Sequence, residues 1–294
     1  MRRHRNRWTG MLYVAPALLF VAVFVLWPLG RLIWLSFTAK SLMSGPDTPV
    51  DFVGLENYAR AFGDKNFWRA MTFTLAYTAY ITPILLVLNL ALALLVSKNT
   101  PPRRATRTVV FLPVVIGLAS SSLLWYWLFD QQVGPFNRLL VDMGILEEPL
   151  VLFKKATTGQ FAVIISVVWK VVGFGMILMV ADIQAIGDDV IAAAMIDGAS
   201  PWKRVRRIII PLAMRSIVLA TLISAIGSML AFDQFYLMSG GGPRGQTFTT
   251  VYWIYQSSFV RFELGYGAAQ AVLLMVVITS GTAVQLWLSR KGQK

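Results

Sequence analysis

The chain has 294 residues, of which 56% are hydrophobic and only 14% are charged. A soluble domain is about 45–50% apolar and about 25% charged, so this chain carries more apolar surface than one water-exposed globule can bury, and a lipid bilayer is its expected solvent. It has no cysteine, and its one histidine is His4. This composition excludes disulfides and thiolate chemistry and argues against a histidine metal site or a Ser/His/Asp triad.

Six apolar stretches are long enough to cross a bilayer. A spanning helix needs about 20 mostly apolar residues, because the hydrocarbon core is about 30 Å thick and each helical residue rises about 1.5 Å. The sequence shows no alternating barrel strands. It therefore predicts an all-α integral membrane fold with six transmembrane helices, near residues 11–37, 71–97, 107–129, 160–182, 213–237 and 266–288.

The first of these stretches is expected to stay in the mature protein as a membrane anchor. Its apolar run is too long for a signal peptide, and Pro28-Leu29-Gly30-Arg31 is not a small-residue cleavage site. The expected order along the chain is a basic tail at 1–10, the first span, an external loop at 38–70, a core domain at 71–288 and a tail at 289–294.

Basic residues gather on one side of the predicted bundle. The two tails, the 98–106 loop and the 183–212 loop, with flanking Arg107 and Arg215, hold 16 basic and 3 acidic residues, whereas the three opposite loops hold nine of each. Because Lys and Arg mark the cytoplasmic side, we expect both termini in the cytoplasm. The net charge of +13 is then a topology signal rather than evidence of nucleic-acid binding.

The longest cytoplasmic loop, 185–212, predicts a helix–turn–helix. Its first half is Ala-rich and apolar, which favours a helix, and Asp197-Gly198 is a turn signal. Ser200 can cap a second helix that starts at Pro201, where a missing N–H costs nothing. We expect Pro211 to end this helix before the fifth span. Two interpretations stay open: an interfacial helix on anionic lipid, and a docking element for a cytoplasmic partner.

This loop resembles the signature of binding-protein-dependent ABC permeases, which is Glu-Ala-Ala, three residues, Gly, and about nine residues later Ile-x-x-Pro. Ala192 stands where the signature has Glu. The resemblance implies that the loop sits in a cleft of an ATPase subunit and transmits its closure. The residues that it assigns to this coupling are Ala193, Ala194, Asp197, Gly198, Ala199, Ser200, Trp202, Arg204 and Pro211.

The resemblance covers nearly the whole chain. The segments Phe52-Val53-Gly54-Leu55-Glu56-Asn57-Tyr58 and Gly240-Gly241-Gly242-Pro243 also look like those of maltose-type and glycerol-3-phosphate-type permeases. The resemblance implies a type I ABC importer bundle that forms half of a pathway for a di- or oligosaccharide. The alternative solute is glycerol-3-phosphate or a related phosphodiester.

The resemblance also implies partners: a second homologous permease, an ATPase dimer and an extracytoplasmic solute-binding protein, all acting at a lipid membrane. The chain has no Walker A pattern, so ATP and Mg would be used by the ATPase, and this chain is expected to hold no cofactor or metal and to catalyse no reaction.

Polar residues inside a membrane are costly and usually face a cavity or a partner helix. For a single Asn or Ser, packing between helices is the simpler explanation. Lys170 lies well inside the fourth span and either lines the pathway or pairs structurally. Aromatic rings near the span ends could stack on a sugar. The candidate pathway residues are Asn89, Trp125, Lys170, Asp233, Gln234 and Tyr236.

Two other classes of function fit less well. A membrane-embedded enzyme would need clustered acids, histidines or a nucleophile within the spans, and the acids here are scattered. An ion-coupled secondary transporter often shows inverted repeats, and no convincing internal repeat is found. Neither class explains the 185–212 loop.

Overall fold

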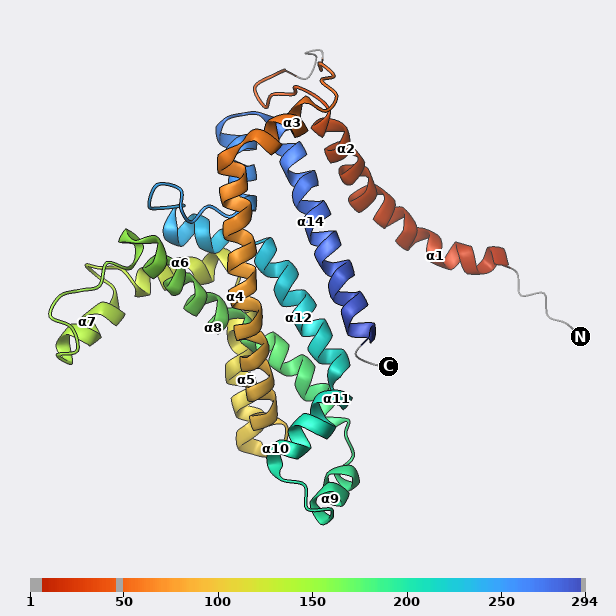
Figure 1. The fold of residues 1–294 in the computed structure, drawn as a ribbon, viewed down its shortest axis with the longest axis vertical. Helices are drawn as coiled ribbons and strands as arrows, with labels where there is room; N and C mark the ends of the chain where they lie inside the picture. The colour runs from red at the N-terminus through yellow and green to blue at the C-terminus, as the bar shows by residue number, and fades with distance from the viewer. Residues whose placement is uncertain (1–6, 46–49, 292–294) are drawn as a thin grey trace, which may run out of the picture. The chain divides into compact units, whose positions relative to one another are not determined.

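The structure is a computed structural model, which describes residues 7–45 and 50–291 (Figure 1). Over these residues the chain is helical, and its β-pairing is limited to an isolated bridge between Thr38 and Phe52. The prediction of an all-α fold is confirmed. The chain divides into two compact units, one made of Met1–Phe67 with Ile254–Val277 and the other of Trp68–Trp253 with Ile278–Lys294.

Four helical stretches are long and apolar enough to cross a membrane. They run over Tyr13–Ser36, Lys65–Val96, Ala156–Gln184 and Leu264–Ser289. The first joins α1 (Arg7–Val21) and α2 (Trp27–Ser36) through a π-helical turn, and the others belong to α4 (Lys65–Val96), α8 (Ala156–Gln184) and α14 (Leu264–Lys291).

Two further candidate spans are bent helix pairs. The axes of α5 (Pro101–Val115) and α6 (Leu118–Leu128) meet at 100°, and the run Pro201–Leu212 meets α12 (Met214–Met229) at 74°. The described chain therefore has up to six spans if each bent pair counts as one. Hydropathy detects the apolar run but not a break inside it.

The predicted third and fifth spans differ most from the structure. At the first break, Ile116 and Gly117 are extended rather than helical. In the predicted span 213–237, α12 ends at Met229, and a separate π-helical turn, Phe235–Ser239, follows. Gly240 closes that turn with φ of 57°, a left-handed conformation that glycine adopts without steric cost.

Shorter helices lie between the long stretches or form part of a bent pair. In chain order they are α3 (Glu56–Gly63), α7 (Pro135–Asp142), α9 (Asp188–Ile196), α10 (Pro201–Arg204), α11 (Ile210–Leu212) and α13 (Thr250–Tyr255).

In the first unit, α3 is joined to the start of α14 by a polar network. Arg60 forms an ion pair with Glu263 at 2.9 Å and stacks over the ring of Tyr266, whose hydroxyl donates to Asp64. Asn57 is buried and donates to the carbonyl oxygens of Ser36 and Thr38. An exposed ion pair alone contributes little to the stability of the fold, so the hydrogen bonds of the buried Asn57 amide are the stronger interaction in this network.

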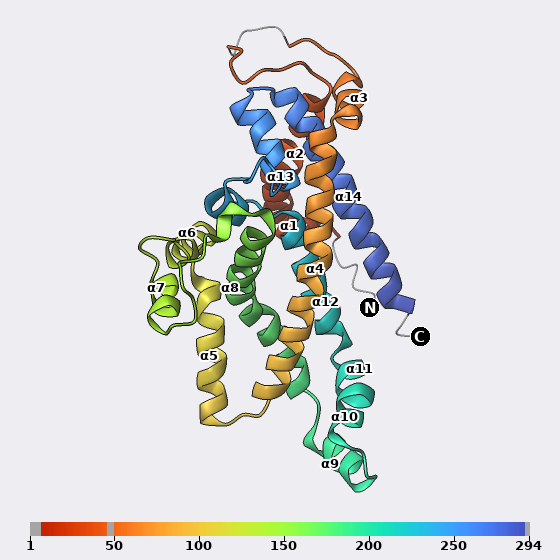
Figure 2. The same ribbon diagram turned by 60° about the vertical axis from the view of Figure 1, so that its left-hand side comes forward.

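In the second unit, α8 is the central helix. It packs against α5 along one side and against α12 on another (Figure 2). A cluster of buried apolar side chains fills the space among α4, α8 and α12, and it includes Ala93, Val96, Met176, Met179, Val180, Ile183, Ala213 and Ala220. At about 1.5 Å per residue the 29 residues of α8 extend about 43 Å, enough to cross a bilayer.

Two glycines of α8 allow close approach of its neighbours. A Cβ on Gly173 would overlap the carbonyl oxygen of Val110 and lie 2.7 Å from the Cα of Phe111 on α5. A Cβ on Gly175 would overlap the side chain of Asn89 on α4. Small residues at such crossings let helix backbones pack closely in a membrane.

We expect Gly173→Ala to lower the thermal unfolding midpoint of the purified chain in detergent, because the added methyl group forces α5 and α8 apart. Overpacking of this kind costs about 1–3 kcal/mol. Gly281→Ala is the matched control, since a Cβ there meets no atom within 4 Å. Equal midpoints for the two variants would show that the close contact between α5 and α8 is not required.

Candidate functional site: the α9–α10 loop and a polar interior

The loop between α8 and α12 folds as a helix–turn–helix. Gly198 ends α9 with φ of 74°, and the N–H of Ala199 donates to the carbonyl oxygen of Ala194 at 2.9 Å. The Ser200 hydroxyl accepts from the N–H of Lys203, which caps α10 with Pro201 in its first turn. The predicted turn and cap are confirmed, because these residue types satisfy the orphan backbone groups at both helix ends.

Pro211 does not end the second helix as expected, since the helical run continues to Leu212. A proline ring clashes with the carbonyl group four residues earlier in a regular α-helix. Here the turn Val205–Ile209 just before it is π-helical, which widens the backbone at the position of that clash. The bend comes at Ala213, beyond the proline.

The loop exposes large apolar side chains among charged ones. Ile196 is 87% exposed, Trp202 68% and Met195 53%, whereas Ala194 is buried. The same loop carries exposed charged side chains, Asp197 and Lys203. An exposed apolar patch with a polar rim is typical of an interaction surface.

The ends of this loop are fixed to the bundle by hydrogen bonds. Gln184, the last residue of α8, donates to the carbonyl oxygen of Ser97 at 2.8 Å, and the N–H of Ser216 donates to the carboxylate of Asp182 at 3.1 Å. Arg107 donates to the carbonyl oxygens of Val96, Ser97 and Lys98, at the end of α4. A cavity of about 680 Å³ lies beside these contacts, between α9 and the ends of α4 and α8.

The candidate pathway residues do not form one site. Lys170 and Gln234 lie together with Ser121, Ser122 and Ser166 in a closed polar cluster. Asn89 is 2% exposed and lies against Gly175, more than a turn farther along α8, and its Oδ1 has no partner in the described part of the chain.

The other three candidates lie around this cluster in different settings. Trp125 packs edge-on against Trp169, with ring centroids 5.6 Å apart. Tyr236 stacks on Phe232, with ring centroids 5.1 Å apart. Asp233 follows Phe232 in the sequence and is half-buried. The structure therefore groups Lys170 with Gln234, whereas Trp125 and Tyr236 pack against different aromatic neighbours.

Lys170 is 7% exposed, and its ammonium group donates to the carbonyl oxygen of Val114 at 2.8 Å. Val114 belongs to the last turn of α5, where carbonyl groups have no partner within the helix. The lysine therefore caps α5 at the 100° break, and its positive charge complements the negative end of the helix dipole.

An apolar cavity of about 230 Å³ adjoins this cluster and shares Leu118, Val167 and Gln234 with it. Its remaining lining comes from α4, α5, α8 and α12, and includes Tyr77. In residues 7–45 and 50–291 no group of three His, Cys, Asp or Glu side chains is placed to hold a metal.

The chain matches the family described as binding-protein-dependent transport system inner membrane component over residues 5–293. It belongs to this family. The permease is thus a multi-pass inner-membrane subunit of an ABC importer, and the prediction of a non-catalytic transport subunit is confirmed by this membership.

Relatives of the permease are named as permease proteins of transport systems. It is 32% identical to the sulfoquinovosyl glycerol transport system permease protein SmoG of Agrobacterium fabrum, over 97% of this chain and 91% of that one. It is 30% identical to the trehalose/maltose transport system permease protein MalF of Thermococcus litoralis, over 98% and 96%.

A solved structure shares the fold of the permease. A bacterial ABC transporter involved in the import of the acidic polysaccharide alginate contains a chain that matches with a TM-score of 0.84 at 20% identity, over 99% of this chain and 98% of that one. The predicted type I importer fold is supported by this match.

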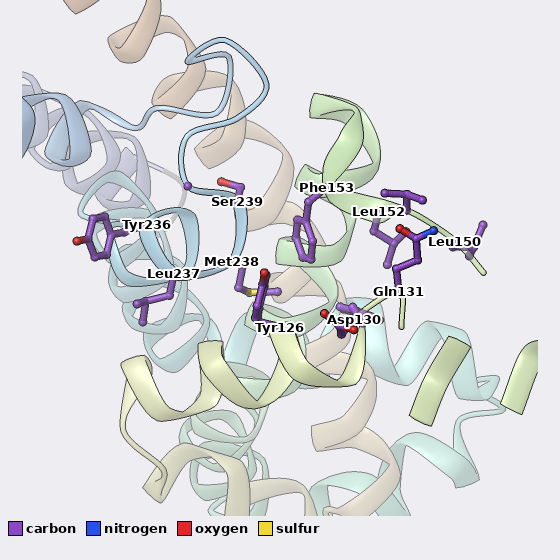
Figure 3. A pocket seen from close by; sticks show the side chains of 13 residues that line it. Tyr126, Asp130, Gln131, Leu150, Leu152, Phe153, Tyr236, Leu237, Met238 and Ser239 are labelled. Carbon is purple, nitrogen blue, oxygen red and sulfur yellow. The ribbon is translucent and has the colours of Figure 1, made fainter. Parts of the chain in front are cut away.

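A cavity at the other end of α8 was not anticipated from the sequence (Figure 3). It measures about 410 Å³, and its walls are the segments 126–131, 150–153 and 236–240. Of the predicted pathway residues only Tyr236 contributes to it. The signal available in the sequence was the aromatic and polar run of 126–131, whereas the segment 150–153, which begins 19 positions after Gln131, is apolar.

We expect Lys170→Met to lower the thermal unfolding midpoint of the permease, because the Val114 carbonyl group loses its donor. A buried polar group left unpaired costs about 1–3 kcal/mol. Lys154→Met, at an exposed lysine before α8, is the control. Solute uptake per assembled complex is measured in parallel.

The two readouts separate the two roles of Lys170. A lowered midpoint with normal uptake per complex would support the cap and contradict a role in the pathway. An unchanged midpoint would contradict the cap.

Proposed function

We propose that the permease forms half of the translocation pathway of an ATP-driven importer for a carbohydrate, and that the α9–α10 loop couples it to an ATPase. The observation that carries the proposal is the match of nearly the whole chain to carbohydrate transport permeases, SmoG and MalF among them. The exposed patch of Met195, Ile196 and Trp202 supports the docking role.

The complete importer would contain a second homologous permease, two ATPase subunits that use ATP and Mg, and an extracytoplasmic binding protein. The most apolar 18-residue window of Tyr13–Ser36 has no buried residue, which agrees with contact to lipid or to the second permease. The basic bias of the tails and of the 98–106 and 183–212 loops supports cytoplasmic termini.

In this arrangement ATP-driven closure of the ATPases moves α9, and the bundle changes between inward-facing and outward-facing forms as a rigid body. The hydrogen bonds of Gln184 and Asp182 would carry this movement from the loop to α4 and α12. The movement would be passed on through these contacts, so no chemistry is required of the permease itself.

Affinity purification of the permease from its native membranes in mild detergent should recover one second permease and one type of ATPase in about double amount, as mass spectrometry would measure. Uptake of labelled maltose, trehalose and glycerol-3-phosphate by cells with and without the gene then distinguishes a sugar from a phosphodiester. Recovery of the folded chain alone would contradict the importer proposal. If glycerol-3-phosphate were the only solute whose uptake depended on the gene, the assignment of a carbohydrate as the solute would be contradicted.

Ile196→Asp should reduce recovery of the ATPase with the permease by at least about 10-fold, because it places a charge in the docking surface. Ile196 is 87% exposed, so the change leaves folding intact. Ile145→Asp is the matched control, since Ile145 is 59% exposed and lies outside the loop. Equal recovery from the two variants would mean that α9 lies on lipid rather than on an ATPase.

A further inference from the structure

The cavity at the start of α8 has walls that are fixed before any ligand arrives. Asn137 is 1% exposed, and its amide nitrogen donates to the carbonyl oxygens of Asp130 and Leu150, both at 3.1 Å. Its amide oxygen accepts from the N–H of Leu150 at 3.0 Å. One buried side chain thus connects two of the three walls, so a ligand would not have to order them.

The third wall is held in a similar way. The hydroxyl of Ser239 bonds to the carbonyl oxygen of Phe235 at 2.8 Å and pairs with the hydroxyl of Thr247 at 2.9 Å. Met238 beside it is 2% exposed. The cavity of about 410 Å³ falls within the range of about 300–1,000 Å³ that is usual for small-molecule sites.

Asp130 is the only charged residue of the lining. Its Oδ1 accepts from the N–H groups of Gln132 at 2.8 Å and Val133 at 2.9 Å. These bonds hold the pKa of the Asp130 carboxyl below its usual value, so the group is ionised at neutral pH. Its Oδ2 has no partner among the residues described and remains able to accept a hydrogen bond.

Aromatic rings stand beside this carboxylate. Tyr126 and Phe153 lie next to each other, with ring centroids 5.7 Å apart, and Figure 3 shows Asp130 and Gln131 to one side of them and Ser239 to the other. Tyr126 is 42% exposed, so part of its ring is free to contact a ligand.

The free carboxylate oxygen of Asp130, the carboxamide of Gln131 and the exposed part of the Tyr126 ring together match the chemistry of a sugar. Sugar hydroxyls donate to carboxylates and exchange hydrogen bonds with amides, and the C–H faces of the ring pack on aromatic rings. A phosphate or sulfonate group would instead meet the negative charge of Asp130 with no basic residue in the lining to offset it.

We propose that this cavity is an entry subsite that binds a neutral, hydroxyl-rich carbohydrate before it reaches the membrane interior. The proposal rests on the proposed carbohydrate function and adds a location and a preference for an uncharged ligand. The cavity lies next to Leu152 and Phe153, just before α8, whereas the docking loop follows the far end of that helix.

Asp130→Asn isolates the ligand contact. The Oδ1 of asparagine can still accept from Gln132 and Val133, so the turn is retained, whereas the free acceptor becomes an amide donor. Tyr126→Leu removes the ring, and Tyr126→Phe retains it. Glu148→Gln, an exposed change of equal charge in the same segment but outside the lining, is the matched control.

Binding of maltose, trehalose, lactose and glucose 1-phosphate to the purified permease complex, without its binding protein, is measured by saturation-transfer NMR. At least one neutral sugar should bind, and glucose 1-phosphate should not. Asp130→Asn and Tyr126→Leu should each weaken binding by about 10-fold, the loss expected for one hydrogen bond to a charged group or one aromatic contact. Tyr126→Phe and Glu148→Gln should bind like the wild type.

Binding of none of the three sugars by a complex that still performs ATP-dependent uptake would overturn the subsite and leave the proposed function standing. Sugar binding that is unchanged in Asp130→Asn and Tyr126→Leu would also overturn it. A third outcome would overturn it as well: the wild type binds no sugar, and the variants lose the stimulation of ATP-dependent uptake by the binding protein. The cavity would then be a protein-docking surface. Loss of uptake in the wild type would contradict the proposed function instead.

Discussion

Lipid offers no hydrogen bonds to a protein backbone, and every break in a membrane helix of this permease has to be satisfied from within the chain. The ammonium group of Lys170 serves the carbonyl group of Val114 at the break between α5 and α6. The carboxylate of Asp182 accepts from the N–H of Ser216 in the first turn of α12, just after the 74° bend. Both side chains belong to α8, so this one helix supports two bent neighbours.

The sequence was sufficient for features that depend on local composition. Apolar length located the helical stretches, and the order Asp197, Gly198, Ser200, Pro201 specified a turn and a cap that depend on those residues alone. The breaks at Ile116 and in 230–232 were missed because apolar residues continue through them. Whether such a stretch bends depends on which side chain of another helix receives the freed backbone groups, and that partner is distant in sequence.

Part of the candidate site could be predicted from the sequence and part could not. The docking loop is a continuous segment, so a motif could identify it. The cavity near Asp130 is assembled from three segments and depends on Asn137, whose importance comes from its burial and its three-way bonding rather than from its residue type. The sequence identified Lys170 as a charge within a span and left both a pathway role and a structural role open. Its hydrogen bond to the carbonyl oxygen of Val114 became visible only in the structure.

The two ends of α8 lie beside the two proposed sites, so this helix would connect them. The proposed sugar subsite lies at its start, and Gln184 and Asp182 connect its end to α4 and α12 beside the docking loop. Between them, Gly173 brings the backbone of α5 close to α8, and Gly175 leaves space for the Asn89 side chain of α4, so neither helix has much room to slide along α8. In the proposed coupling, a displacement of α9 by an ATPase would therefore be passed to α8 and its neighbours together, and the break capped by Lys170 would be the place where α6 changes its angle to this group.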